Sequence, residues 1–508
     1  MNKLSQVKAL NGNGAKYLSI LGDFYVSLGS GTHYVYSAYG PQLAQRLGFS
    51  ATQSEVIATL GSVGVYFSGP PAGIIIDSKP PHIPIAIGGC LILLGYMMMR
   101  LAYVNEIRSL AFVGIWMIVA SMGNTFAYHA CVKCAAMNFP HRRGTATSIP
   151  VAGYGLSALF FSQVGNAAFG GDTARFMLMI PLLGSGLVFA GLPLVRLIKP
   201  VREADAESAP EEQALLDRIE PAPKEIGYST MIAEDDKLAL SVASSSSSAT
   251  AVAEDEPATE VDALADEVDI HGWALFRQWR FWIHFCIHGL LSGTGLMYIL
   301  SAGYVLRALI TYDNPMVTPA ELQRNQALQV SLISSFSFIG RIVAGMSADR
   351  LKRMGHQRMW VILASAIIFT FAQIGGLTVN TLRYMWFISI FNGLGYGVLF
   401  GSYASIISET FGLKRFSENY GYLTCATVFG SDVFAYSFGA IYDANSHFVD
   451  MGDTMRMAMQ EQVCTKGLYC YRTAFMITLP GDLIAICLAL VVIYIDHRRL
   501  TRQAALTN

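Results

Sequence analysis

The chain has 508 residues, of which 53% are hydrophobic and only 14% are charged, and its mean hydropathy is +0.41. Soluble domains carry about 25% charged residues, so this composition excludes an ordinary soluble protein and predicts a membrane protein. A net charge of −1 provides no basic surface for nucleic acid, and eight dispersed cysteines do not form the dense framework of a small secreted fold.

Segments long and apolar enough to span a membrane recur along the chain. A helix that crosses a hydrocarbon layer of about 30 Å needs about 20 apolar residues. The polar, basic start has no short apolar core followed by a cleavage site, so we expect the first apolar segment to be a permanent span. We predict twelve spans, at residues 17–39, 55–76, 83–104, 110–134, 145–168, 176–198, 279–305, 327–348, 358–378, 384–408, 419–442 and 473–495.

The connection between the sixth and seventh predicted spans differs from the rest of the chain. Residues 201–270 are rich in Asp and Glu, contain a run of serines from Ser244 to Ser248 and have almost no aromatic side chains. Such a segment cannot bury enough apolar surface to offset its ordering entropy. We therefore predict a six-helix bundle over 1–200, an acidic disordered linker over 201–270 and a second six-helix bundle over 271–508.

The distribution of basic residues predicts the orientation of the spans. With the N-terminus in the cytoplasm, about 23 of the 35 lysines and arginines fall in cytoplasmic segments and about 10 outside, and the bias persists without the long connection. Both termini lie on one side because the number of spans is even. We expect an integral, multi-pass monomer of the plasma or vacuolar membrane with both termini in the cytoplasm.

The two predicted bundles carry the same landmarks. Gly345 and Asp349 lie 272 positions after Gly73 and Asp77, and the basic "LKRF" after the tenth span follows "HRRG" after the fourth in the same register. The first span contains "SGTHYVY" and the seventh "SGTGLMY". These repeats predict an internal duplication, and transporters built from such repeats bind their solute at the interface between them.

These motifs resemble the major facilitator superfamily over the whole chain apart from the acidic connection. The superfamily signature is Gly-x-x-x-Asp-Arg followed by basic residues, after the second and eighth spans. The second copy here, "GRIVAGMSADRLKRMGHQR", is nearly complete, whereas the first, "GPPAGIIIDSKPPH", has Ser78 in place of the arginine. Three further stretches resemble the nodulin-like branch, which includes fungal monocarboxylate transporter homologues: "GTHYVYSAYGPQLAQRLGFSATQ", "NFPHRRGTATSIPVAGYGLSALFF" and "SETFGLKRFSENYGYL".

The resemblance implies an all-α membrane protein with twelve transmembrane helices in two pseudo-symmetric six-helix bundles around a central cavity. An aspartate at a helix end beside arginines forms charge-assisted hydrogen bonds that hold neighbouring helices in one arrangement and release them in another. The alternative is that Asp349 and Arg350 only mark a helix end. A charge inside a span needs a partner, so we expect Arg341 to pair with another helix. The predicted gating residues are Gly73, Asp77, Arg143, Arg341, Gly345, Asp349 and Arg350.

Polar side chains concentrate in the first, fourth, seventh and tenth spans, which line the cavity in this superfamily. In the fourth span they recur every four residues and cover one helix face, at Ser121, Thr125, His129 and Lys133. The candidate solute-binding residues are His33, Tyr36, Asn124, Tyr128, His129, His288, Tyr298, Asn392 and Tyr396.

Histidine titrates near physiological pH, which makes intramembrane histidines candidates for carrying a coupling proton. We assign this hypothesis to His33, His129, His288 and Asp432. The alternative for each histidine is a hydrogen bond between helices. For Lys133, the alternative to a place in the cavity is a side chain that reaches toward the membrane surface.

No motif indicates catalysis or a cofactor. Cys131 and Cys134 have CxxC spacing but lie in a predicted membrane helix without a second ligand pair, so neither zinc nor redox chemistry is expected. Cys464 and Cys470 share a predicted outer loop and form a candidate disulfide. We predict no enzyme activity, no metal and no cofactor.

The sequence therefore predicts a secondary transporter that moves a small polar organic solute by alternating access. His, Lys and Tyr donors in the cavity spans favour a carboxylate, and proton coupling is a hypothesis. Two alternatives stay open: a transporter-fold sensor that signals through the acidic segment, and an efflux pump of broad specificity with a bulkier, more aromatic cavity. The expected partners are the solute, the lipid bilayer and protons, but not nucleic acid.

Overall fold

The predicted apolar segments form long helices in the computed structural model, which describes residues 12–49, 51–169, 172–198, 270–313, 319–449 and 461–507. The first half contains α1 (Gly12–Ser30), η2 (Thr32–Val35), α2 (Tyr36–Leu47), α3 (Ala51–Phe67), α4 (Gly69–Ser78), α5 (His82–Val104), α6 (Leu110–Asn138), η3 (Pro140–Arg142), α7 (Arg143–Phe169) and α8 (Thr173–Gly191). The second half contains α11 (Trp273–Phe276), α12 (Trp279–Asp313), α13 (Pro319–Arg353), α14 (Met359–Thr378), η4 (Leu382–Tyr384), α15 (Met385–Phe411), α16 (Phe416–Thr424), α17 (Ala426–Asn445), β1 (His447–Val449), β2 (Glu461–Val463), η5 (Gly467–Cys470) and α18 (Arg472–Thr507).

Each of the twelve predicted spans corresponds to one of these helices or to consecutive ones. Nine helical stretches of the described residues are long and apolar enough by themselves to cross a membrane. The other three spans are α1 with η2 and α2, α7, and α16 with α17. Large apolar side chains point outward from the helices, such as Leu182, which is 55% exposed, and Val433, which is 61% exposed. Such exposure is normal against lipid tails, which are as apolar as leucine.

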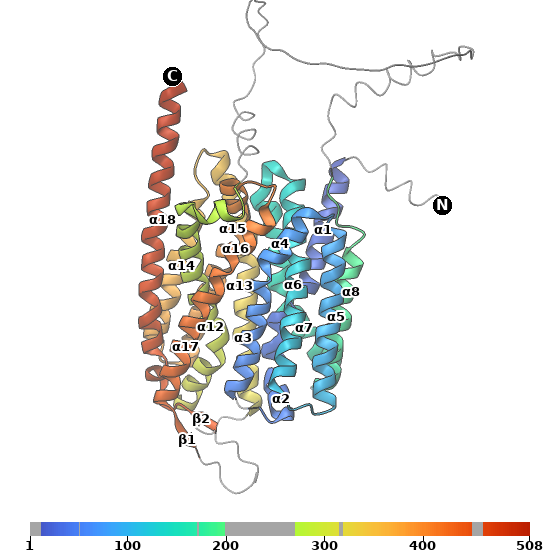
Figure 1. The fold of residues 1–508 in the computed structure, drawn as a ribbon. Coiled ribbons are helices and arrows are strands. Elements are labelled where there is room, and N and C mark those ends of the chain that lie inside the picture. Colours follow the sequence, from blue (N-terminus) through green and yellow to red (C-terminus); the bar gives the residue numbers. More distant parts are fainter. Residues whose placement is uncertain are drawn as a thin grey trace, which may run out of the picture. The chain divides into compact units, whose positions relative to one another are not determined.

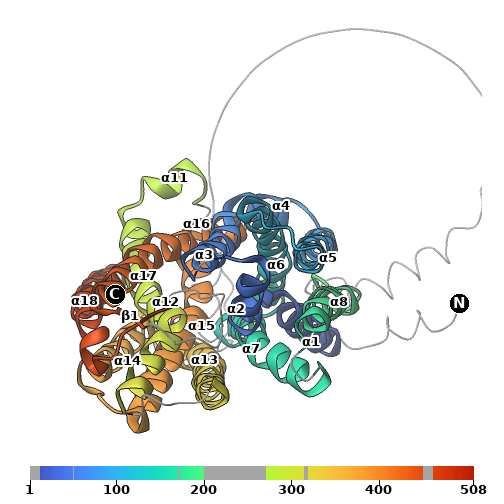
Figure 2. The same cartoon turned by 90° about the horizontal axis from the view of Figure 1, so that it is seen from below.

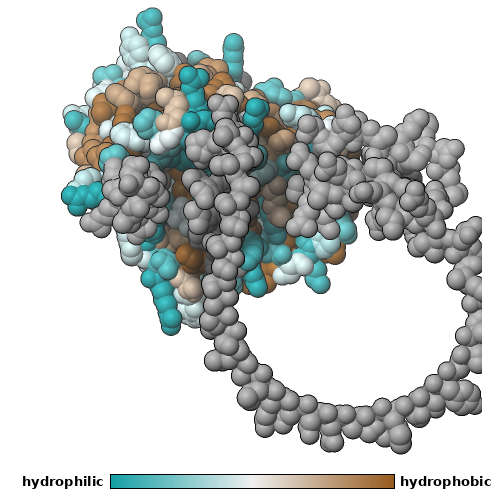
Figure 3. Space-filling view, turned by 90° about the horizontal axis from the view of Figure 1, so that it is seen from above, coloured by the Kyte–Doolittle hydropathy of each residue, from teal (hydrophilic) through white to brown (hydrophobic). Residues whose placement is uncertain are grey.

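The two ends of the helical array differ. In Figure 1, α1 begins and α18 ends at the top, whereas β1 and β2 lie at the bottom, where they pair as an antiparallel hairpin with His447 opposite Val463. We call these ends the terminal side and the hairpin side. Figure 3 views the terminal side, where hydrophilic side chains lie among hydrophobic ones. The sequence analysis did not predict the hairpin, whose short strands lie outside every predicted span.

The helices form two groups whose most extensive contacts join α7 to α13 and α4 to α16. Figure 2 shows α1–α8 as one group and α12–α18 as the other, with α7 packed against α13, and α4 against α16 on the opposite flank. The predicted linker over 201–270 lies outside the described residues except for Ile270, and the predicted three-part division of the chain stays a prediction.

The glycine-rich, polar stretch in the first span breaks the helix. Residue Gly31 separates α1 from η2, and a Cβ there would lie 2.1 Å from the Ser157 hydroxyl oxygen on α7. That hydroxyl donates to the Leu28 carbonyl, while the hydroxyl of Thr32 donates to Asn124 on α6. Because lipid offers no hydrogen bonds to an interrupted backbone, such a break needs partners from neighbouring helices.

A second set of glycines brings α13 and α15 together. Gly393, Gly397 and Gly401 recur every four residues on α15 and face α13, where added Cβ atoms would lie within 2.2–2.5 Å of backbone carbonyl oxygens. Small residues at this spacing let helix backbones approach closely in a membrane. The close approach fixes α13, the helix that carries three of the predicted gating charges, Arg341, Asp349 and Arg350.

This packing predicts the effect of a methyl group at Gly397. We expect Gly397→Ala to lower the free energy of unfolding by about 1–3 kcal/mol, because its Cβ would lie 2.2 Å from the Ser337 carbonyl oxygen. The measurement is the unfolding temperature of the purified protein in detergent. Gly186→Ala is the control, since its Cβ meets no atom within 4 Å. Equal unfolding temperatures for the two variants would contradict the role assigned to Gly397.

Candidate functional site

A small cavity lies between the two halves. Its volume is about 20 Å³, which holds a water molecule but no organic solute. One cation and a ring of mainly aromatic side chains form its wall: Tyr34, Val65, Tyr66, Tyr128, His129, Tyr154, Arg341, Phe400, Tyr420 and Thr424. The structure therefore shows this site in a closed form.

Tyrosines from both halves meet around the cavity. The Tyr396 hydroxyl on α15 lies 3.4 Å from the hydroxyls of Tyr34 on η2 and Tyr66 on α3. The rings of Tyr128 and Tyr154 pack with their centroids 4.5 Å apart. A phenol combines an apolar ring with a hydroxyl group, so this wall suits a solute with a polar group on a small organic body.

Arg341 on α13 supplies the positive charge of the cavity wall and is only 2% exposed. Its guanidinium donates a hydrogen bond to the Val151 carbonyl on α7, so Arg341 meets a helix of the other half. Within the described residues it forms no ion pair with an acidic side chain, and its Nε has no hydrogen-bond partner. A buried cation without a counter-ion is unfavourable, so the cavity is electrostatically suited to an anion.

A glycine makes room for this guanidinium. A Cβ at Gly155 on α7 would lie 2.4 Å from Nη1 of Arg341. The Phe400 ring lies on α15, with its centroid 5.9 Å from Cζ of Arg341. The charge is thus held by α7 and α15 in a fixed place between the halves.

Two of the predicted solute-binding residues line the cavity directly, and a third adjoins it. Tyr128 and His129 on α6 belong to the wall, and Tyr396 contacts the wall through its hydroxyl. The His129 ring lies 5.2 Å from the Tyr420 ring, and its Nδ1 has no hydrogen-bond partner among the described residues. Their role in binding stays a prediction.

The predicted residues of the first span and Asn124 lie inside the first half. His33 Nε2 lies 3.2 Å from the Ser62 hydroxyl oxygen, and Asn124 Oδ1 accepts the hydrogen bond from Thr32. Tyr36 donates to a backbone carbonyl near the start of α3. The structure thus gives these residues partners between helices, away from the cavity wall.

The predicted residues of the second half are similarly distributed. His288 Nε2 lies 3.3 Å from the Thr427 hydroxyl oxygen, and the Tyr298 hydroxyl lies 2.7 Å from that of Ser389. Asn392 is fully buried and is not part of the cavity wall. Asp432 is exposed on α17, also away from the wall.

Sequence reasoning missed four tyrosines of the wall. Tyr66, Tyr154 and Tyr420 belong to the second, fifth and eleventh spans, which the superfamily pattern does not assign to the cavity. Tyr34 stands in the quoted first-span motif, but only the helix break turns it rather than Tyr36 toward the cavity. The remaining signal was the unusual number of tyrosines in these apolar segments.

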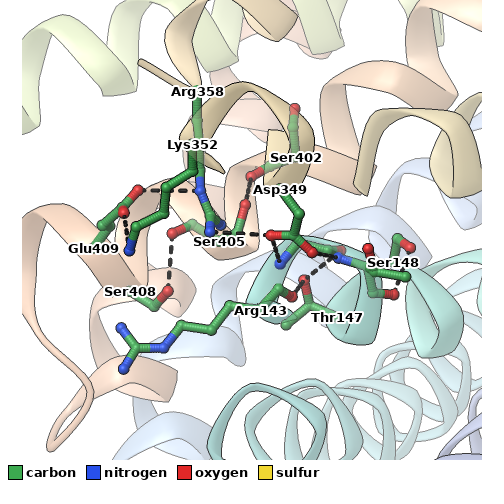
Figure 4. Close-up of polar contacts among 12 residues, drawn as sticks. Arg143, Thr147, Ser148, Asp349, Lys352, Arg358, Ser402, Ser405, Ser408 and Glu409 are labelled. Atoms are coloured by element: carbon green, nitrogen blue, oxygen red, sulfur yellow. Dashed lines mark hydrogen bonds and ion pairs between the residues drawn. The ribbon is translucent and has the colours of Figure 1, made fainter. Parts of the chain in front are cut away.

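The second copy of the gating motif joins the two halves on the terminal side (Figure 4). Asp349, at the end of α13, accepts hydrogen bonds from the backbone N–H groups of Gly144 at 2.9 Å and Thr145 at 2.6 Å. These groups lie in the first turn of α7, where N–H groups have no partner within the helix and the helix dipole favours a negative charge. Arg358 contacts the same carboxylate at 3.1 Å.

The first copy repeats this arrangement. Asp77, at the end of α4, accepts hydrogen bonds from the backbone N–H groups of Ser417 at 3.2 Å and Glu418 at 2.9 Å, in the first turn of α16. Lys133 on α6 lies 2.9 Å from this carboxylate, so it reaches the gating motif and not the cavity. We call Asp77 with its partners the first latch, and Asp349 with its partners the second latch.

The two signature glycines allow the latches to close. A Cβ at Gly73 would lie 2.5 Å from the Ser417 carbonyl oxygen, and one at Gly345 would lie 2.3 Å from the Gly144 carbonyl oxygen. Both contacts cross between the halves, so any larger side chain would hold the helices apart.

The structure places Arg358 next to Asp349, and the gating role of Arg143 and Arg350 stays a prediction. Arg350 is exposed, and its side chain makes no hydrogen bond or ion pair within the described residues. The side chain of Arg143 runs away from Asp349 in Figure 4. The cation that contacts Asp349 is Arg358, the residue directly before α14. Its side chain is 3% exposed.

The cysteines behave as two separate groups. Cys464 and Cys470 form a disulfide near the hairpin side, whereas Cys131 and Cys134 are buried and unoxidised in α6. In the part of the chain that the structure describes, no group of three His, Cys, Asp or Glu side chains is arranged to hold a metal ion.

Comparisons with known proteins agree with this architecture. A family model described as Nodulin-like matches residues 16–219. The chain is 27% identical to the uncharacterized membrane protein YMR155W of Saccharomyces cerevisiae, over 91% of each chain, and 24% identical to the probable transporter MCH1 of Gibberella zeae, over 84% of this chain and 81% of that one. It is similar in structure to the transporter FucP in its outward conformation, with a TM-score of 0.52, 14% identity, and coverage of 93% of this chain and 98% of that one.

The helices and these comparisons indicate an integral, multi-pass membrane protein with the fold of the transporter FucP. The predicted fold class of twelve helices in two bundles is confirmed. The chain is similar to the Nodulin-like family over residues 16–219 and to fungal MCH1 proteins, as the motifs predicted.

The geometry of the second latch predicts that replacing one carboxylate by an amide opens the terminal side. We expect Asp349→Asn to shift the ratio of closed to open forms about tenfold or more toward the open form, because it weakens charge-assisted bonds to Gly144, Thr145 and Arg358. The measurement is the rate at which a membrane-impermeant maleimide labels a cysteine placed at Ser148, in a chain without the other free cysteines.

Arg350→Gln is the matched control for this experiment. It removes an exposed charge one residue away whose side chain makes no hydrogen bond or ion pair within the described residues, so the labelling rate should stay unchanged. If Arg350→Gln accelerated labelling as much as Asp349→Asn, the signature arginine and not the carboxylate would hold the halves together.

Proposed function

We propose that this protein carries a small organic anion with a carboxylate group across its membrane by alternating access. The observation that supports this substrate class is Arg341, a buried cation without an acidic partner among the described residues, on the wall of the central cavity. An arginine binds a carboxylate through two parallel hydrogen bonds, and the surrounding phenols add further donors. The apolar ring faces would contact the organic part of the solute.

The latches support the alternating-access part of the proposal. Both join the end of one helix to the start of a helix in the other half, so separating the halves on the terminal side breaks both sets of contacts together. The cavity lies between the same halves. Rocking of one half against the other would therefore open the cavity toward one side at a time.

We propose that the terminal side faces the cytoplasm. The excess of lysine and arginine in the segments assigned to that side supports this orientation. The disulfide between Cys464 and Cys470 lies toward the hairpin side, and disulfides persist in oxidising compartments outside the cytosol. The plasma membrane and the vacuolar membrane both fit this orientation.

Among the histidines, His129 is the proposed proton carrier. It lies on the cavity wall, whereas His33 and His288 contact hydroxyl groups inside single halves. A proton on His129 would add a second positive charge beside an anionic solute. Proton uptake and solute binding would then favour each other.

The substrate class is tested with sealed vesicles that contain the purified protein. We expect uptake of radiolabelled carboxylates, surveyed as a panel of mono- and dicarboxylates, and at least a hundredfold loss of uptake in Arg341→Gln. The physical reason is that the neutral amide keeps hydrogen bonding but removes the charge that attracts the anion. Arg46→Gln, which removes an exposed arginine paired with Glu106, is the control and should transport normally.

A second variant separates position from charge. Gly155→Ala keeps Arg341 but displaces its guanidinium, so it should raise KM more than it lowers the maximal rate. Solute binding without uptake by the native protein would contradict transport and favour the sensor alternative. Uptake of neutral or cationic solutes that survives Arg341→Gln would contradict the anion assignment.

Proton coupling is tested with His129→Gln. We expect the native protein to accumulate solute against its gradient when an inward proton gradient is imposed, because protonation of His129 favours anion binding. The variant should keep exchange of solute at equal pH but lose accumulation. His33→Gln should retain accumulation, and loss of it in this control would move the proton site away from the cavity.

A further inference from the structure

The two latches have the same hydrogen-bond geometry but different charges. In the second latch, Arg358 contacts Asp349 at 3.1 Å and Glu409 at 3.2 Å, and Lys352 contacts Glu409 at 2.8 Å. Two carboxylates and two cations thus share one cluster, visible in Figure 4. In the first latch, Asp77 has one cation, Lys133.

The internal duplication shows that this difference is built into the sequence. Arg358 precedes the first residue of α14, and the equivalent residue before α5 is Pro81, which has no charge. Glu409 on α15 corresponds to Met137 on α6, 272 positions earlier. The first latch therefore lacks an arginine that joins the aspartate to a second carboxylate.

The replacement cation comes from a different helix. Lys133 on α6 corresponds to Ser405 on α15, which only donates to the Ser402 carbonyl. The Lys133 ammonium contacts the Asp77 carboxylate at 2.9 Å and donates to the Ile76 carbonyl at 3.2 Å, so it also fixes the end of α4. The side chains of Lys133 and Asp77 are 10% and 1% exposed.

Because the side chains of Asp77 and Lys133 are buried, the stability of the first latch depends on the Lys133 ammonium group. Removing one partner of a buried ion pair leaves an uncompensated charge, which is strongly unfavourable. Asp77 accepts a hydrogen bond from the backbone N–H of Glu418. The carboxylate of this same residue is buried and paired with Arg415. Without Lys133, the Asp77 carboxylate would have no cation and would lie near a second negative charge.

We propose that Lys133 is the positioning residue of the first latch: its ammonium group takes the place of the arginine of the second latch and keeps the Asp77 carboxylate on the first turn of α16. Closure of the terminal side then depends on a single amine in one half and on a four-charge cluster in the other. This inference rests on the proposed alternating-access function.

The test measures closure directly and needs no solute. The full-length protein in lipid nanodiscs carries a reporter cysteine at Ser148 in a chain without the other free cysteines, and an impermeant maleimide measures its exposure. Lys133→Met keeps the apolar stem but removes the charge, and we expect labelling at least about tenfold faster. Lys79→Met removes an exposed lysine two residues from Asp77 and should leave the rate unchanged.

A rescue variant separates charge from packing. Pro81 and Lys133 line one crevice together with Ile76, so an arginine at position 81 reaches the same place as the lysine. Pro81→Arg combined with Lys133→Met should restore slow labelling to within about threefold of the native rate, and Lys133→Arg alone should label slowly. Unfolding temperatures confirm that each variant is folded.

Three outcomes would overturn the inference: equal rates for Lys133→Met and Lys79→Met, fast labelling of Lys133→Arg, or no rescue by Pro81→Arg in a folded protein. No solute is present in the labelling assay. Failure of carboxylate transport in the vesicle experiment therefore leaves this result intact, and failure here leaves the carboxylate site intact.

Discussion

The structure depends on two carboxylates that cap helices belonging to the opposite half. Asp77 and Asp349 each accept hydrogen bonds from two backbone N–H groups in the first turn of a helix. These N–H groups have no partner within their own helix, and lipid tails offer none. These bonds are directional and short in range. They therefore form only when the helix ends approach as closely as Gly73 and Gly345 allow. The central cavity is small because the halves are drawn together in this way.

Features that follow from solvent and register could be predicted from the sequence. The lengths of the apolar segments determine the spans, because lipid requires each backbone to satisfy itself within a helix. The equal spacing of Gly73 and Asp77 to Gly345 and Asp349 revealed the duplication, and the structure places all four at contacts between the halves. Both features depend on residues close together in the sequence, so a local pattern is enough to predict them.

Features that depend on side-chain direction could not be predicted. Tyr34 and Tyr36 are two residues apart, and the short helical break decides which of them faces the cavity. Lys133 shares a helix face with His129 in a regular four-residue pattern, yet it lies one turn further along α6, where it meets Asp77. Arg350 occupies the arginine position of the sequence motif, but the arginine that contacts Asp349 in the structure is Arg358. In each case a distant helix determines the role, and no local pattern records its position.

The solitary charge of Arg341 has a further consequence for energetics. A cavity that holds one buried cation is positive when it is empty, and a singly charged anion neutralises it as long as His129 carries no proton. An elementary charge that crosses a potential of 100 mV changes its energy by about 2.3 kcal/mol. In the proposed transport cycle, the membrane voltage therefore acts on the reorientation of the empty protein, whereas a cavity loaded with the anion alone carries almost no net charge.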